Sequence, residues 1–228
     1  MSFKHRSYEK ELLDGKNISF EDIRLNMQEL DFINKHLGGH KVTINGIKPF
    51  AARPAMHVVE IGCGGGDNLR VIKEWCVKKN IEVQLSGIDI NKECISFATE
   101  RSTNKGINFI CSDYSLIQFE QQPDIIFSSL FCHHFNDDEL IEMMQWIYKH
   151  CKYGFFINDL HRHSLAYYSI KFLTKAFSKS YMVKNDAPLS VKRGLKKNEW
   201  KRIFAEAGIK NYQIKWKWAF RWLIICYK

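Results

Sequence analysis

The densest glycine cluster of the chain follows an apolar, β-branched run in the stretch VVEIGCGGGDNL, residues 58–69. Four of the five residues from 62 to 66 are glycine. Glycine loses much conformational entropy in ordered backbone, so such a cluster indicates a sharp turn or a close approach to the main chain. The helical spacing of Leu69, Ile72 and Cys76 places this cluster between a strand and a helix.

Short apolar runs alternate with amphipathic segments through the middle of the chain. This rhythm predicts an α/β fold, a doubly wound sheet with helices on both faces. We expect strands at 56–61, 82–90, 107–113, 124–131 and 154–159, and helices at 68–79, 91–101 and 137–151. A further helix, 196–207, ends at Gly208. Two closing strands, 210–218 and 220–228, have almost no loop between them and must be antiparallel, which makes seven strands, mostly parallel.

Two segments have no position in this sheet. Residues 1–50 have a largely helical pattern and are expected to form an N-terminal cap segment, ahead of a cofactor-binding domain over 51–228. Residues 161–195 are expected to be a cap insertion, made of a helix and an irregular segment in which Pro188 lies in a lid loop. Six side chains of this insertion are expected to form an aromatic, apolar pocket lining: Tyr167, Tyr168, Phe172, Phe177, Tyr181 and Met182.

Charge is distributed unevenly along the chain. From His161 onward sixteen Lys and Arg face three acidic residues, a net charge of +13 within a chain of net charge +9, and four of the six tryptophans lie there. Such a face can serve nucleic acid, an anionic membrane surface or a lipophilic ligand, and it can also be simply solvated. The seven cysteines include no CxxC pair, which indicates reduced thiols and a cytoplasmic location. No apolar run is long enough to span a membrane.

The glycine turn discriminates between two classes of cofactor. A dinucleotide fingerprint needs a third glycine where this chain has Asp67 or Leu69, so the pattern for NAD fails. The pattern that remains is E-x-G-x-G-x-G, starting at Glu60 and ending at Gly66. It resembles motif I of the class I S-adenosylmethionine-dependent methyltransferases, and the resemblance covers roughly residues 50–228. It implies S-adenosylmethionine as the cofactor.

Strand ends further along the chain extend this resemblance. Asp89 ends the second strand, where the resemblance implies that a carboxylate accepts the ribose hydroxyls and Ile90 covers the adenine. Asp113 ends the third strand and Tyr114 follows it. The resemblance implies that Asp113 accepts the adenine amino group and that Tyr114 also contacts the adenine. The full set of predicted cofactor-binding residues is Glu60, Gly62, Cys63, Gly64, Asp89, Ile90, Asp113, Tyr114 and Leu130.

Candidate catalytic residues lie after the fourth and fifth strands, which flank the methyl group in this fold. Histidine is suited to accept a proton near neutral pH, so His133, His134 and His161 are candidate bases. Asp159 is a candidate to orient a histidine or bind the acceptor hydroxyl. The histidine pair can equally be structural, capping the next helix. We predict no metal, because serines stand where a metal-dependent mechanism would want carboxylates.

The segments at both ends of the domain are similar to bacterial small-molecule methyltransferases associated with type III polyketide synthases. The stretches concerned are ELLDGKNISFEDIRLNMQELDFINKHLGGH and NDLHRHSLAYYSIKFLTKAFSKSYMVKNDAPLSVKRGLKKNEW. This similarity implies O-methylation of a small, hydrophobic, phenolic or polyketide-type acceptor, delivered from solution, a carrier or a membrane. Two alternatives stay open: an RNA methyltransferase, suggested by the basic C-terminal part, and a non-catalytic cofactor-binding protein.

Overall fold

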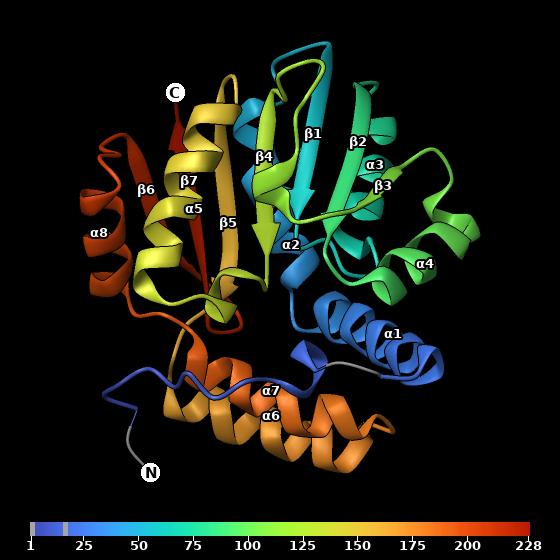
Figure 1. The fold of residues 1–228 in the computed structure, drawn as a ribbon, viewed down its shortest axis with the longest axis vertical. Helices are drawn as coiled ribbons and strands as arrows, with labels where there is room; N and C mark the ends of the chain where they lie inside the picture. The colour runs from blue at the N-terminus through green and yellow to red at the C-terminus, as the bar shows by residue number, and fades with distance from the viewer. Residues whose placement is uncertain (1–2, 16–17) are drawn as a thin grey trace.

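The computed structural model describes residues 3–15 and 18–228 and is built around one sheet (Figure 1). The strand order is β3-β2-β1-β4-β5-β7-β6. Its strands are β1 (Ala55–Ile61), β2 (Glu82–Asp89), β3 (Asn108–Cys111), β4 (Ile125–Ser129), β5 (Gly154–Leu160), β6 (Tyr212–Lys217) and β7 (Arg221–Tyr227). The first five are parallel, and β7 is antiparallel to both β5 and β6. The predicted doubly wound sheet with an antiparallel C-terminal hairpin is confirmed.

Helices cover both faces of the sheet. Successive side chains of the central strands point to opposite faces, so each face has its own hydrophobic core. In β4, Ile126 packs in one core with residues of α5 and α8, while Ile125 and Phe127 pack in the other with residues of α2 and α3. The helices are α1 (Phe20–His36), α2 (Gly39–Ile47), α3 (Asp67–Lys78), α4 (Lys92–Glu100), α5 (Asp137–His150), α6 (Ser164–Phe177), α7 (Tyr181–Arg193) and α8 (Lys197–Glu206). Short 3₁₀ helices are η1 (Leu12–Asp14), η2 (Lys48–Phe50), η3 (Ser102–Asn104), η4 (Tyr114–Leu116) and η5 (Cys132–His134).

The segment after β5 differs from the expectation. It forms two helices, α6 and α7, which pack side by side at the carboxyl-end edge of the sheet (Figure 1). The prediction of a lid loop at Pro188 is wrong, since Pro188 lies inside α7. A proline inside a helix removes one backbone hydrogen bond. Burial of Met182, Val183 and Leu189 on the same helix offsets that loss.

The start of the chain is also less helical than expected. Residues 3–15, here called the N-terminal strap, run extended across α7 and end with the short helix η1 (Figure 1). The Ser7 amide donates to the Lys192 carbonyl at 3.1 Å. The amides of Leu12 and Leu13 donate to the Asp186 carboxylate at 2.8 and 3.0 Å. The expected helical cap therefore begins with a strap held by α7, and its residues 1–2 and 16–17 lie outside the described part.

Candidate active site

The glycine turn joins β1 to α3, as predicted. Gly62, Gly64 and Gly66 have φ values of 67°, 48° and 73°, in the left-handed region that glycine tolerates best. A Cβ on Gly62 would lie 2.2 Å from the Phe131 ring, and one on Gly66 would lie 2.6 Å from the Phe109 ring. Two of these glycines are therefore required by the packing of the protein's own aromatic rings, in addition to the turn.

A cavity of about 900 Å³ opens beyond this turn, at the carboxyl ends of β1, β2 and β4. This is where open α/β sheets bind ligands, beside the point at which the strand order reverses. All nine residues predicted to bind the cofactor line the cavity. Further lining comes from the strap, from α1 and from the loop after β4, including Tyr8, Leu13, Met27, Leu30, Phe131 and Phe135.

Two carboxylates at strand ends line the cavity. Asp89 accepts the Gly64 amide on one oxygen and the Asn91 amide on the other, both at 2.9 Å. Burial raises the pKa of Asp89 against these bonds. Glu60 is 1% exposed, and neither of its carboxylate oxygens has a hydrogen-bond partner among the described residues. Burial and the nearby charges of Asp67 and Asp89 raise the pKa of Glu60 well above its usual range.

The remaining predicted cofactor residues are apolar or part of turns. Tyr114 packs edge-on against Phe131 and Trp146, and burial raises the pKa of its hydroxyl. Asp113 caps η4 by accepting the Ser115 amide at 2.9 Å. Ile90 lines the cavity and is largely exposed, as an apolar surface for a flat ring would be. Leu130 also lines the cavity. Its backbone has a positive φ, and its amide donates a hydrogen bond to the Asn158 carbonyl at 2.9 Å.

These residues fit S-adenosylmethionine. The unpartnered Glu60 carboxylate would be stabilised by an ammonium group, such as that of the methionine part of the cofactor, because a buried charge needs a partner. Asp89 retains lone pairs beyond its two amide bonds, so it can still accept hydroxyl groups. Gly64 contributes an open backbone approach, since only the Met27 sulfur would come within 4 Å of an added Cβ.

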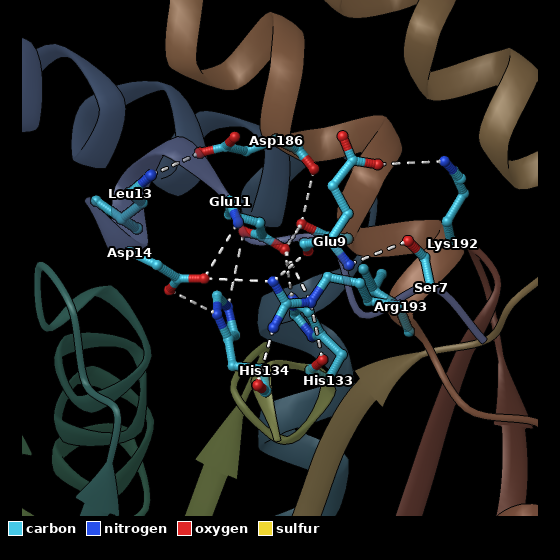
Figure 2. Close-up of polar contacts among 12 residues, drawn as sticks. Ser7, Glu9, Glu11, Leu13, Asp14, His133, His134, Asp186, Lys192 and Arg193 are labelled. Carbon is cyan, nitrogen blue, oxygen red and sulfur yellow. Dashed lines mark hydrogen bonds and ion pairs between the residues drawn. The ribbon is translucent and has the colours of Figure 1, made fainter. Parts of the chain in front are cut away.

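The predicted histidines separate into three environments. His134 lines the cavity, and its Nδ1 lies 3.0 Å from Asp14 Oδ1 of the strap (Figure 2). His133 is 2% exposed and does not line the cavity; its Nδ1 lies 2.7 Å from Asp159 Oδ1 and its Nε2 lies 3.4 Å from Glu11 Oε1. Although burial opposes it, the Asp159 and Glu11 carboxylates raise the pKa of His133 to about 9.

His161 lies apart from the other two. Its amide donates to the Phe220 carbonyl at 2.8 Å, its ring lies against Trp222, and it does not line the cavity. Burial and the positive charges of His163 and Lys196 lower the pKa of His161 to about 4. Of the three histidines, only His134 lines the cavity. His133 is held by Asp159, and His161 lies away from the cavity and from the other two histidines.

Residues 58–154 match the family model described as a methyltransferase domain. This match covers the glycine turn and the strand ends that carry the carboxylates. The chain contains a class I S-adenosylmethionine-dependent methyltransferase domain. Its cofactor is S-adenosylmethionine. No curated protein matches the sequence significantly.

Solved structures share the fold of this methyltransferase at low sequence identity. Human N-acetylserotonin methyltransferase, solved with S-adenosylmethionine, has a TM-score of 0.66 and 18% identity over 92% of this chain and 56% of its own. A proposed O-methyltransferase from Nostoc punctiforme has a TM-score of 0.61 and 13% identity, and the match covers 89% of this chain and 60% of that protein. Magnesium protoporphyrin IX methyltransferase from Synechocystis has a TM-score of 0.58 and 11% identity, and the match covers 95% of this chain and 88% of that protein. The chain thus spans about 60% of the length of the first two proteins.

The histidines also have neighbours that the sequence analysis did not predict. Glu11 and Asp14 of the strap face His133 and His134. Arg193 of α7 donates to the main-chain carbonyls of both histidines, at 3.1 and 2.8 Å (Figure 2). The acidic residues lie about 120 positions from the histidines, so no local pattern could pair them. Glu11, His133 and His134 are also close enough to share a cation, so the absence of a metal stays a prediction.

The expected aromatic lining is placed elsewhere. Tyr168, Phe172, Phe177 and Tyr181 are exposed on the outside of the methyltransferase, and Tyr167 and Met182 are buried in its core. None of the six lines the cavity. The prediction is wrong because helix α6 turns its buried face toward α7 and the strap, and the strap supplies the lining in its place.

Proposed function

We propose that the methyltransferase transfers a methyl group to an oxygen of a small, hydrophobic acceptor, with His134 as the general base. The observation that carries this proposal is the contact between His134 Nδ1 and Asp14 Oδ1 in the cavity wall. A carboxylate that accepts the Nδ1 proton leaves the Nε2 lone pair free to take a proton from a hydroxyl group.

The electrostatics of the strap favour this role. When bound, S-adenosylmethionine supplies an electrophilic methyl group, and the protein must align the acceptor with it and remove the acceptor proton. Glu11 Oε2 lies 3.7 Å from His134 Nε2, and the Asp14 contact is 3.0 Å, so two carboxylates stabilise the imidazolium that forms. Hydrogen bonding to His134 lowers the pKa of Asp14 to about 2 against its burial, which keeps this carboxylate charged.

A small acceptor is supported by the side chains that border the cavity. We infer that the strap, α1, α2 and the α6–α7 pair form a cap, since strap side chains such as Tyr8 and Leu13 close one wall. Small-molecule methylation by proteins of the same fold, including the human N-acetylserotonin enzyme, is consistent with this. Within this class we favour phenolic, polyketide-type acceptors, whose apolar rings suit the lining of Met27, Leu30 and Phe131.

The test is S-adenosylhomocysteine formation with a series of hydrophobic phenols. His134→Gln is expected to lower kcat by about 10²–10⁴-fold while cofactor affinity stays within a few-fold. His36→Gln, an exposed histidine on α1, is the matched control and is expected to keep the wild-type rate. Unchanged kcat in His134→Gln would leave positioning alone as the mechanism. The series is repeated with a chelator, which is expected to change nothing.

The same assay addresses the two alternatives. Methylation of RNA with steep salt dependence and no turnover of phenols would make this an RNA methyltransferase. Cofactor binding without turnover of either substrate class would favour the non-catalytic alternative. We expect phenol turnover and no RNA product, because the strap contributes apolar side chains such as Leu13 to the cavity wall, which suits a small apolar acceptor.

A further inference from the structure

Helix α6 has an apolar outer face. Leu165, Tyr168, Phe172 and Phe177 are between 54% and 78% exposed. The spacing of three and four residues between the first three places them along one side of the helix. Leu173 lies beside them at 37% exposed. Phe177 is also exposed, but it lies five residues after Phe172 and is therefore turned to another side of the helix. Leu165, Tyr168, Phe172 and Leu173 are here called the α6 face. Helix α6 lies at the outer edge of the molecule, beyond α7 (Figure 1).

The other side of α6 is already packed. Ala166 and Tyr167 are buried against Val191 of α7, with Phe3 of the strap in contact. Thr174 is buried as well, and its hydroxyl donates to the Ile170 carbonyl at 2.9 Å. The α6 face therefore has no role in the core of this chain. An apolar row of this kind on a surface marks an interaction site.

Positive charge surrounds the α6 face. Lys171, Lys175, Lys179 and Lys184 are all exposed. Between residues 160 and 185 the sequence contains five basic residues and no acidic residue. The fifth, Arg162, is buried and paired with Glu199. The Glu29 carboxylate contacts the end of α6, where it accepts from the Ser178 hydroxyl and the Lys179 amide.

We propose that the α6 face docks the methyltransferase on an anionic lipid surface. A helix lying in the membrane plane buries leucine and aromatic side chains at the level of the headgroups, while flanking lysines reach the lipid phosphates. The α6 face has this arrangement, with Leu165, Tyr168 and Phe172 along the row and Lys171 and Lys175 beside it. Among the described residues no helix is long and apolar enough to cross a membrane, so the contact is peripheral.

The positive charge argues against dimerisation through the α6 face. Two α6 faces packed on each other would bring their lysine rows together without acidic partners, and such repulsion is unfavourable. Leu165 and Leu173 argue against RNA as the partner of this face, because bases stack on aromatic rings and gain little from contact with leucine. This proposal is independent of the proposed function, since it concerns binding alone.

The experiment is vesicle flotation with the full chain. Vesicles contain phosphatidylcholine alone or phosphatidylcholine with phosphatidylglycerol. Wild type is expected to float with the anionic vesicles and to stay unbound with the neutral ones. Leu165→Ser/Phe172→Ser and Lys171→Glu/Lys175→Glu are each expected to lower the partition coefficient by about 10-fold or more.

Matched controls make the same chemical changes elsewhere. Val77→Ser/Leu116→Ser removes two exposed apolar side chains, and Lys201→Glu/Lys210→Glu reverses two exposed charges near α8. Both controls are expected to float like wild type, and all variants should show the same thermal shift with S-adenosylhomocysteine. Equal flotation of α6 variants and controls, or no flotation of wild type, would overturn the proposal. So would a dimer or an RNA complex that the Leu165→Ser/Phe172→Ser change abolishes in a protein that does not bind vesicles.

Discussion

Stability should depend on pH through one buried histidine, His133. Its imidazole contacts Asp159 at 2.7 Å and faces Glu11 at 3.4 Å, which raises its pKa to about 9 from an ordinary value of 6.5. A group with a raised pKa stabilises the folded state fully below its unfolded pKa, and this stabilisation is lost as the pH rises through the folded pKa. Each pKa unit corresponds to about 1.4 kcal/mol, so the imidazolium contributes about 3 kcal/mol near pH 6.

The assay is urea unfolding of wild type and His133→Gln at several pH values from 6 to 9.5. The variant is expected to be less stable by about 3 kcal/mol at pH 6, and the difference should shrink between pH 6.5 and 9. Taking the difference removes the contribution of the cysteines, which titrate in both proteins. His5→Gln, which alters an exposed histidine of the strap, should follow the wild-type curve. Parallel curves for wild type and His133→Gln would refute the assignment of a charged His133.

Two further changes test the turn and the strap. Gly62→Ala is expected to lower the free energy of unfolding by about 2 kcal/mol or more in urea titrations, because φ is positive and Phe131 blocks the Cβ. Gly208→Ala, with positive φ but open space around it, should cost about 1 kcal/mol, and an equal loss would contradict the role of Phe131. Asp186→Ala removes the acceptor of two strap amides, so hydrogen exchange at Leu12 should accelerate at least tenfold, and unchanged exchange would show that other contacts hold the strap.

The sequence predicted the sheet because its signals are local. Short apolar runs, the cap at Asn91 and the left-handed Gly208 identify strands and helix ends within a few residues. The cofactor residues also follow from local position, since each lies at a strand end and a parallel sheet brings those ends to one edge. The nine predicted residues accordingly line one cavity.

The cap could not be predicted in the same way, because it depends on packing between distant segments. Pro188 favoured a loop by its own chemistry, and only the burial of its neighbours in α7 shows why a helix persists. The aromatic residues of α6 indicated a buried lining, but a helix pattern does not say which face meets the core. Nothing near His134 in sequence indicates that Asp14 of the strap is its partner.

The most direct test of the central claim is calorimetric titration of the protein with S-adenosylhomocysteine and, separately, with NAD. Wild type is expected to bind the first and not the second. Asp89→Ala should weaken binding by about 100-fold or more, because two hydrogen bonds from ribose hydroxyls to a charged acceptor are lost. Tight binding of NAD with no binding of S-adenosylhomocysteine would contradict the interpretation of the glycine turn.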